Sequence, residues 1–290
     1  MDLSIIIVNW NATDYLRDCL ASIYCETRNL NIEVIVVDNA SRDDSCAELI
    51  RREFPWVVLY CSKDNLGFAR GSNLGYELSS GEILLFLNPD TQIQGNVFAD
   101  MVKEIWSNAN TGAVGPKLLN GDGSLQTSCI RAYPTIVNQL LDSEFLRNKF
   151  PLSRLWGMQP LFASTANPVR VDVISGACLM VKRDVFVQVG KFDENYFMYV
   201  EDIELCRRIT ASKYIIQYMN ECEVTHYGGK SSEVQGRYFA NLRQQEAICQ
   251  YFSATKGSWY SFLYRSGLAF VAMLRLLIIV CLLPFRKVAH

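Results

Sequence analysis

The sequence predicts an α/β fold with a mostly parallel sheet flanked by helices, and three observations support this prediction. Short runs of apolar and β-branched residues recur along the first third of the chain. Segments with apolar residues at helical spacing separate these runs. Polar residues follow the runs directly, as Asp38 follows one run and Asn88 and Asp90 follow another. Buried strands that alternate with amphipathic helices form right-handed βαβ units, and therefore a parallel sheet.

The pattern of each segment predicts its element. Strands are expected at residues 3–8, 32–37, 56–60, 83–87, 113–116 and 214–218, with a further strand region at 169–181 that is broken at Ser175 and Gly176. Helices are expected from Thr13 or Asp14 to about Ile23, around Cys46 to Ile50, after Asn65, and at 95–107, 183–189, 203–209 and 234–254. Residues 120–123 predict a turn, whereas residues 127–168 carry no clear pattern.

Composition excludes some classes of function. Of the 290 residues, 50% are hydrophobic and 20% are charged, and the net charge is −2. Such a chain has no basic field that would hold nucleic acid in general. The ten cysteines are scattered and form no C-x-x-C pair, which favours reduced thiols in a cytoplasmic protein over a disulfide framework or a zinc site. No signal peptide is recognised at the N-terminus.

The C-terminal part differs from the rest. We expect one domain at residues 1–235 and a helical segment at 236–290, which contains an apolar helix at about 259–285. Arg275 interrupts its apolar core, and aromatic residues precede that core. This pattern favours a helix on a membrane surface, such as the inner face of the plasma membrane. A short membrane span, or packing in a core or in a dimer interface, is the alternative.

A dinucleotide-binding fold is the nearest structural rival. That fold needs a glycine-rich turn after the first strand so that a pyrophosphate can approach a helix. Here the corresponding turn, residues 9–14, contains no glycine. Gly67, Gly71 and Gly75 are spaced by four residues, which is a different pattern. A bound diphosphate would therefore need a partner other than a glycine-rich turn. Separately, Asp38 at the end of the second strand could accept hydrogen bonds from a base or ribose.

Two groups of residues could perform chemistry. Asp90 could hold Mg²⁺ or Mn²⁺, since these hard cations take one or two carboxylates and leave positions for phosphate oxygens. His226 leaves a strand and could add a ligand best suited to Mn²⁺, although a histidine at a strand end is often structural. Glu201 and Asp202 open a helix, where Asp is also an ordinary cap. Adjacent acids after an aromatic loop suit a general base.

The order of the motifs resembles family 2 glycosyltransferases, and most closely their bacterial rhamnosyltransferase-like branch. The resemblance covers residues 1–235. The matching segments are Ser4–Asn11, Val36–Ser41, Asn65–Asn73, Leu85–Asp90, Ser175–Cys178, Gly190–Glu194, Phe197–Asp202 and His226–Ser232.

The resemblance implies a GT-A fold that binds a nucleotide-diphosphate-sugar and a divalent metal, and transfers the sugar with inversion. It assigns Asp202, with Glu201 beside it, to the catalytic base motif, and Asp90 and His226 to the metal. The residues that it places around the nucleotide-sugar are Val8, Trp10, Asp38, Asn65, Arg70, Asn73, Asn88 and Gly176. Asn88 departs from the family, because an acid usually stands there. Its neutral side chain implies weaker, more substrate-dependent metal binding.

Three functions follow as expectations. The first is metal-dependent transfer of a sugar, with rhamnose as the branch-level expectation, to a hydroxyl of a glycan or lipid-linked acceptor in cell-surface polysaccharide synthesis. The second is a non-catalytic nucleotide-sugar-binding scaffold, which Asn88 favours and the acids at 90, 201 and 202 oppose. The third is a nucleotidyltransferase, which usually has a glycine-rich basic loop that this chain lacks.

Overall fold

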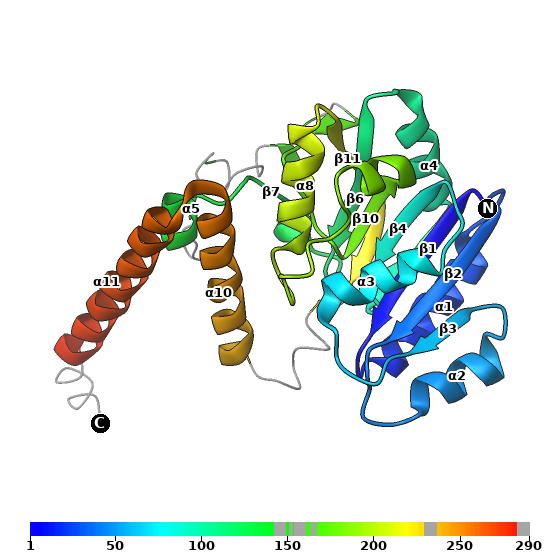
Figure 1. The fold of residues 1–290 in the computed structure, drawn as a ribbon, viewed down its shortest axis with the longest axis horizontal. Helices are drawn as coiled ribbons and strands as arrows, with labels where there is room; N and C mark the ends of the chain where they lie inside the picture. Colours follow the sequence, from blue (N-terminus) through cyan, green and yellow to red (C-terminus); the bar gives the residue numbers. More distant parts are fainter. Residues whose placement is uncertain are drawn as a thin grey trace.

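The computed structural model describes residues 1–141, 149–150, 153, 161–162, 164, 167–228 and 237–282. The described strands are β1 (Leu3–Asn9), β2 (Ile32–Asp38), β3 (Val58–Cys61), β4 (Ile83–Leu87), β5 (Thr91–Ile93), β6 (Thr111–Leu119), β7 (Ile130–Arg131), β8 (Val169–Arg170), β9 (Val173–Ile174), β10 (Cys178–Lys182) and β11 (Ile215–His226). Within these residues, a nine-stranded sheet has the order β3-β2-β1-β4-β10-β6-β11-β5, with β8 also paired to β11 (Figure 1). Strands β7 and β9 form a separate small sheet.

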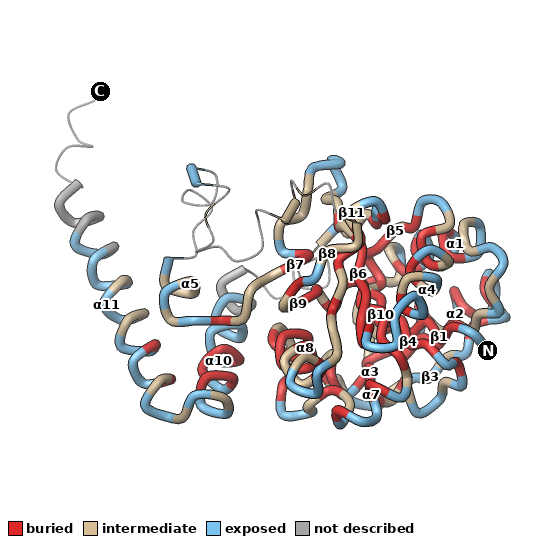
Figure 2. The backbone as a smooth tube through the Cα atoms, turned by 90° about the horizontal axis from the view of Figure 1, so that it is seen from above, coloured by how far each residue is buried: buried red, intermediate tan, exposed pale blue. Residues whose placement is uncertain are grey.

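Helices lie on both sides of this sheet (Figure 2). They are α1 (Thr13–Glu26), α2 (Ser45–Glu53), α3 (Gly67–Glu77), α4 (Val97–Ser107), α5 (Ile136–Leu140), α7 (Arg183–Gln188), α8 (Glu201–Ala211), α10 (Arg237–Lys256) and α11 (Ser258–Leu282), with a 3₁₀ turn at Thr127–Cys129. Helix α3 packs against β1 and β2, and α4 packs against β6, β10 and β11. The predicted α/β fold with a mostly parallel sheet flanked by helices is confirmed.

The first half of the sheet is parallel, as predicted. Strand β1 pairs in parallel with both β2 and β4, and β2 pairs in parallel with β3. All five residues of β4 are buried, which explains their unbroken apolar run. Parallel strands end at the same edge, so Asn9, Asp38 and Asn88 come together there.

The second half of the sheet is mixed, which the strand–helix alternation did not indicate. Strand β10 lies antiparallel between β4 and β6. Strand β5 was not predicted: it follows Asp90 directly and pairs antiparallel with β11. Strand β11 is one strand of 12 residues with irregular register between Met219 and Glu223, where the sequence predicted a shorter strand.

The glycines of α3 serve close packing against β1. A Cβ atom on Gly75 would lie 2.4 Å from Ile6 Cγ2, and one on Gly71 would lie 2.9 Å from Val8 Cγ1. Only a residue without a side chain allows the helix to approach the strand so closely. The four-residue spacing therefore reflects helix–sheet packing.

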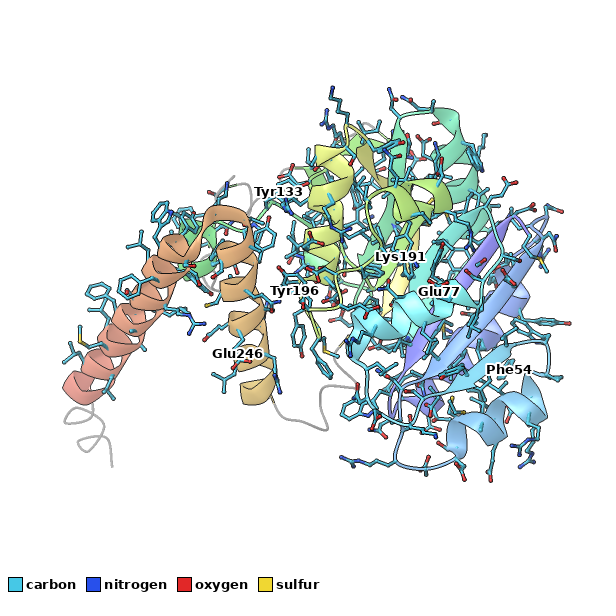
Figure 3. All side chains as sticks on the ribbon, in the orientation of Figure 1. Phe54, Glu77, Tyr133, Lys191, Tyr196 and Glu246 are labelled. Atoms are coloured by element: carbon cyan, nitrogen blue, oxygen red, sulfur yellow. The ribbon has the colours of Figure 1, made fainter. Side chains whose placement is uncertain are left out.

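Helices α10 and α11 form an antiparallel pair beside the sheet, with α5 packed against α11 (Figure 1). Phe252 of α10 meets the rings of Tyr260 and Tyr264 of α11 at centroid distances of 4.9 and 5.2 Å. Tyr133 and Tyr196 lie at the boundary between the sheet domain and these helices (Figure 3). The predicted domain boundary at residue 235 lies outside the described residues, so the two-part division stays a prediction.

Much of α11 is exposed (Figure 2), and several of its exposed residues are large and apolar. Trp259, Phe262, Phe270 and Leu276 are 63%, 67%, 56% and 61% exposed. The aromatic residues that precede the apolar core thus divide: Tyr260 and Tyr264 turn inward, whereas Trp259 and Phe262 face outward. Among the described residues, no helix combines the length and apolarity that a membrane crossing needs.

Candidate functional site

A cavity of about 390 Å³ opens at the carboxyl-terminal edge of β1, β2 and β4. Open α/β sheets bind their ligands at this edge. Nine of the twelve predicted site residues line the cavity: Val8, Trp10, Asn65, Asn88, Asp90, Gly176, Glu201, Asp202 and His226. They come from segments far apart in the sequence, which the sheet order brings together.

One wall of the cavity is built where β2 meets the start of α3. Asn39 is 2% exposed, and its Nδ2 donates hydrogen bonds to Asn65 Oδ1 at 3.0 Å and to the Gly67 carbonyl at 3.1 Å. Its Oδ1 accepts from the Leu66 backbone N–H at 2.8 Å. These bonds fix the wall that carries Asn39, Asn65 and Gly67, so this part of the cavity is held by the protein's own contacts.

Asp38 lies behind this wall and does not line the cavity. Its Oδ1 accepts hydrogen bonds from Asn9 Nδ2 at 2.8 Å and from Ser41 Oγ at 2.6 Å. Asn39 provides the cavity-lining polar group next to it. The contacts of Asp38 therefore support the loop, rather than place its carboxylate in the cavity.

Arg70 and Asn73 also lie away from the cavity. Arg70 Nε is 3.2 Å from Glu194 Oε2, and Asn73 Nδ2 donates to the Phe192 carbonyl and to Glu194 Oε1, both at 3.0 Å. Both residues line a separate, more open depression beside α3. They tie α3 to the loop that precedes α8.

Asp90 and His226 meet because β5 pairs with β11. Thr91 lies opposite His226 in this pairing, and the Tyr227 backbone N–H donates to the Asp90 carbonyl at 2.9 Å. His226 Nε2 consequently lies 3.2 Å from Asp90 Oδ1 and 3.1 Å from Asn88 Nδ2. The Asp90 side chain is 6% exposed.

Gln126 orients the imidazole of His226. Its Nε2 donates to Asn120 Oδ1 at 3.1 Å, so its Oε1 faces His226 Nδ1 at 2.7 Å. Nδ1 then carries the proton of the neutral ring, and Nε2 presents a lone pair toward Asp90 and Asn88. Buried partners of this kind fix the tautomer of histidine ligands in metal sites.

Asp90 and His226 could together bind a divalent cation if a bound diphosphate supplied further ligands. Asp90 offers a carboxylate oxygen and His226 offers an unprotonated nitrogen, a set that suits Mn²⁺ and accommodates Mg²⁺. The described residues contain no group of three or more His, Cys, Asp or Glu side chains that could hold a metal by themselves. Diphosphate oxygens and water would have to complete the coordination.

Asp202 is buried at the start of α8 and accepts three hydrogen bonds. Oδ2 accepts from Arg131 Nη2 at 2.6 Å and from the Gly176 backbone N–H at 3.0 Å. Oδ1 accepts from the Ile203 backbone N–H at 2.8 Å. The carboxylate therefore has a fixed position at the cavity wall, where it could accept a proton from a bound hydroxyl.

Glu201 has a different electrostatic environment. Its Oε2 accepts from the Val200 backbone N–H at 2.9 Å. Burial and, secondarily, the charge of Asp202 raise the pKa of the Glu201 carboxyl to about 8. At neutral pH this carboxyl is mainly protonated, so Asp202 is better suited to act as the base.

The loop before α8 closes one side of the cavity. Tyr199 has a φ angle of 92°, an uncommon conformation for a residue with a side chain. The Phe197 carbonyl accepts from the Phe68 backbone N–H at 2.8 Å. A Cβ atom on Gly67 would lie 2.4 Å from that carbonyl oxygen, so glycine is required at this contact.

Among the cavity residues that sequence reasoning did not assign to the site are four with polar side chains: Asn39, Gln126, Arg131 and Gln244. Gln126 and Arg131 follow the turn at 120–123, which returns the chain toward the sheet and could have indicated that the next residues reach its edge. Asn39 was not singled out because Asp38, the residue before it, was the predicted ligand-binding residue of this loop. Gln244 lies on α10, in the segment that the sequence separated from the catalytic domain.

Comparison with known proteins agrees with this architecture. A family model described as glycosyl transferase family 2 matches residues 4–187. The chain is 30% identical over 247 residues to an N-acetylglucosaminyl-diphospho-decaprenol L-rhamnosyltransferase of Mycobacterium tuberculosis, covering 79% of this chain and 77% of the relative. It is 25% identical to a rhamnosyltransferase of Escherichia coli, covering 77% and 82%. A mannosyltransferase from Pyrobaculum calidifontis, solved with GDP-Man and Mn²⁺, shares the fold with a TM-score of 0.59 and 17% identity, covering 98% of this chain and 82% of that structure.

Proposed function

The chain belongs to glycosyl transferase family 2 and is a glycosyltransferase with the GT-A fold, and from this premise we propose its reaction. It transfers a sugar from a nucleotide-diphosphate-sugar to a hydroxyl of a glycan or lipid-linked acceptor, with inversion at the anomeric carbon and with the help of a divalent metal. The single observation that carries the proposal is the cavity in which Asp90 with His226 and Asp202 with Glu201 meet. The non-catalytic scaffold is not favoured, because the curated relatives are named as transferases.

Asp202 is the proposed catalytic base. It takes the proton of the acceptor hydroxyl while the hydroxyl oxygen bonds to the anomeric carbon and the bond from that carbon to the diphosphate oxygen breaks. The proposal needs no covalent sugar–enzyme intermediate. A single displacement of this kind inverts the configuration of the anomeric carbon.

Asp90 and His226 are the proposed metal ligands. The metal, when bound, would offset the negative charge that grows on the departing nucleotide diphosphate. Asn88, as a neutral residue whose amide contacts His226, contributes no charge to the ion. We therefore propose that the donor diphosphate supplies much of the metal's coordination, so that metal and donor bind together.

The proposed nucleotide-sugar contacts are arranged around the same cavity. Val8, Trp10, Asn65 and Gly176 line it and would contact the donor directly. Asp38, Arg70 and Asn73 are not proposed as direct contacts of the donor, since each is bonded to protein groups outside the cavity. Asp38 would support the loop after β2, and Arg70 and Asn73 would tie α3 to the loop before α8. Rhamnose is the proposed sugar, because two relatives are named as rhamnosyltransferases.

The acceptor proposal rests on the relative from Mycobacterium tuberculosis and on α11. That relative's name contains a sugar on a diphospho-decaprenol, a lipid carrier. The exposed apolar face of α11 would lie in a membrane surface and hold the cavity near such an acceptor. We accordingly propose that the protein works in cell-surface polysaccharide synthesis, at the cytoplasmic side of the membrane.

A two-stage experiment tests the proposal. A panel of nucleotide-diphosphate-sugars is screened with Mn²⁺ for an increase in the unfolding midpoint, because a ligand that binds the native state stabilises it by mass action. The best donors are then incubated with lipid-linked and free glycans, and the configuration of the product is determined. Donor binding with a retained anomeric configuration would contradict the inverting reaction, and the absence of transfer to any acceptor class would contradict the proposed function.

A further inference from the structure

We infer that Arg131 is a positioning residue that holds Asp202 so that its Oδ1 atom, and not its Oδ2 atom, takes the acceptor's proton. This inference rests on the proposed function and adds a residue that the motif pattern does not contain. Arg131 itself need not touch the substrate. It acts through the carboxylate of Asp202.

The contacts of the carboxylate distinguish its two oxygens. Oδ2 receives two donors, Arg131 Nη2 at 2.6 Å and the Gly176 backbone N–H at 3.0 Å. Oδ1 receives one donor among the described residues, the Ile203 backbone N–H at 2.8 Å. An ionised carboxylate offers about two lone-pair positions on each oxygen. Both positions on Oδ2 are therefore filled, and one position on Oδ1 is left for an incoming proton.

The small sheet of β7 and β9 brings both Oδ2 donors to the same place. Arg131 lies opposite Val173 in this antiparallel pair, and β9 continues directly into Ser175 and Gly176. The Ser175 backbone N–H also donates to the Cys129 carbonyl at 2.9 Å, which extends the pairing. The two strands thus carry a guanidinium and a backbone N–H to one oxygen, outside the main sheet.

The charges and the burial of the pair make the contact strong. The Asp202 side chain is 6% exposed and that of Arg131 is 29% exposed, so water screens the pair only in part. Arg131 Nε is buried and has no hydrogen-bond partner among the described residues. The ion pair with Asp202 is therefore the principal described interaction of this guanidinium. Removing it would leave the carboxylate with only the two backbone donors of Gly176 and Ile203, and so would widen the range of its side-chain torsions.

A double-mutant cycle tests the inference on the full chain. Arg131→Met should lower kcat about 100-fold and change the KM for the donor less than about 3-fold, because a displaced base slows the chemical step without removing a donor contact. Arg131→Lys should recover part of the lost kcat, since it keeps the charge with a less specific geometry. Asp202→Asn combined with Arg131→Met should be no slower than Asp202→Asn alone.

Arg170→Met is the matched control, because Arg170 lies on the neighbouring short strand β8 and is exposed. It should leave kcat within about 2-fold of wild type, as expected for a surface change away from the site. Additive losses in the cycle, or an Arg131→Met variant with wild-type kcat, would overturn the inference.

A measurement of folding separates this inference from the proposed function. The same four proteins of the cycle are unfolded with urea, which needs no turnover. Coupling between Arg131 and Asp202 in the free energy of unfolding is expected whatever reaction the protein catalyses. If the wild-type protein shows no transfer but the cycle shows this coupling, the proposed function is refuted. The conclusion that Arg131 anchors Asp202 is then still supported. The absence of coupling refutes the anchoring itself.

Discussion

His226 Nε2 lies 3.2 Å from Asp90 Oδ1, and both atoms present lone pairs when the His226 ring is neutral with its proton on Nδ1. Two such atoms repel each other unless a proton or a cation lies between them or beside them. The arrangement is held from outside, by the pairing of β5 with β11 and by Gln126. In that protonation state the protein keeps two electron-pair donors close together at the cavity wall, an arrangement that suits a divalent metal.

Substitution of Asp90 should uncouple donor binding from the metal. Asp90→Ala removes the carboxylate, so the increase in unfolding midpoint that a nucleotide-sugar produces should no longer depend on Mn²⁺. Thermal unfolding with the donor, in the presence of Mn²⁺ and in the presence of a chelator, measures this. Asp43→Ala, in an exposed loop, serves as the control and should keep the metal dependence. Equal metal dependence in Asp90→Ala and wild type would rule out Asp90 as a ligand.

Replacing the proposed base should stop transfer and spare binding. Asp202→Asn keeps the size of the side chain but removes its ability to take a proton, so kcat should fall by about 10²- to 10⁴-fold. The dissociation constant of the donor should change little, because the carboxylate faces the acceptor side in the proposed reaction. Product formation in a radiolabelled transfer assay measures the rate. A variant that transfers sugar at the wild-type rate would require another base.

The stability of the protein should depend on pH through Glu201. The pKa of this carboxyl is raised from 4.5 to about 8 in the folded protein by burial and by the charge of Asp202. Between these two values the unfolded chain is ionised and the folded protein keeps the proton, so stability falls as pH rises from about 4.5 to 8, by up to about 1.4 kcal/mol per pH unit. Below about pH 4.5 the protonated Glu201 carboxyl makes its full contribution to the free energy of unfolding, and above about pH 8 this contribution is lost.

Glu201→Gln should remove this part of the pH dependence. Urea unfolding at pH 5 and at pH 8.5 should show a smaller loss of stability in the variant than in the wild type. Glu48→Gln on α2 provides a control with an acid in an ordinary helical position. Parallel stability curves for Glu201→Gln and wild type would contradict the raised pKa.

The exposed face of α11 should control attachment to membranes. Replacing Phe262, Phe270 and Leu276 by serine removes apolar surface that would be buried in a bilayer, and should weaken binding to phosphatidylglycerol-containing vesicles by more than about 10-fold. Cosedimentation with the vesicles measures this. Tyr24→Ser, at an exposed site on α1, should bind as wild type does. If the triple variant keeps its vesicle binding but changes from dimer to monomer in sedimentation, α11 is an interface between copies.

A methyl group on Gly75 should destabilise the sheet. Gly75→Ala places a Cβ atom 2.4 Å from Ile6 Cγ2, so α3 or β1 must shift. Overpacking of this kind costs about 1–3 kcal/mol, which outweighs the gain in helix propensity. Gly95→Ala is not a neutral comparison, because its φ of +71° disfavours a side chain. Ser72→Ala, which changes a residue of α3 as Gly75→Ala does, is the better control. Urea unfolding should show a clear loss for Gly75→Ala, and an equal or higher stability than wild type would contradict the tight packing.

The sequence by itself determined the first half of the fold and the residue types of the site. Buried parallel strands need continuous apolar runs, so Ile83–Leu87 could be recognised from local composition. The abrupt change to polar residues after such a run located the edge of the sheet. Asp90, Glu201, Asp202 and His226 were found by their types and by the order of the motifs, and they line one cavity.

The tertiary structure alone decided which of these residues meet. The antiparallel strands β5 and β10 depend on pairing between segments far apart in the chain, and nothing in a three-residue segment such as Thr91–Ile93 records its partner. That pairing places His226 beside Asp90. In the same way, the small sheet of β7 and β9 gives Asp202 its guanidinium partner. Contacts between α3 and the loop before α8 likewise direct Arg70 and Asn73 toward Glu194. These residues are distant in the sequence, so their neighbours in the chain do not indicate the contact.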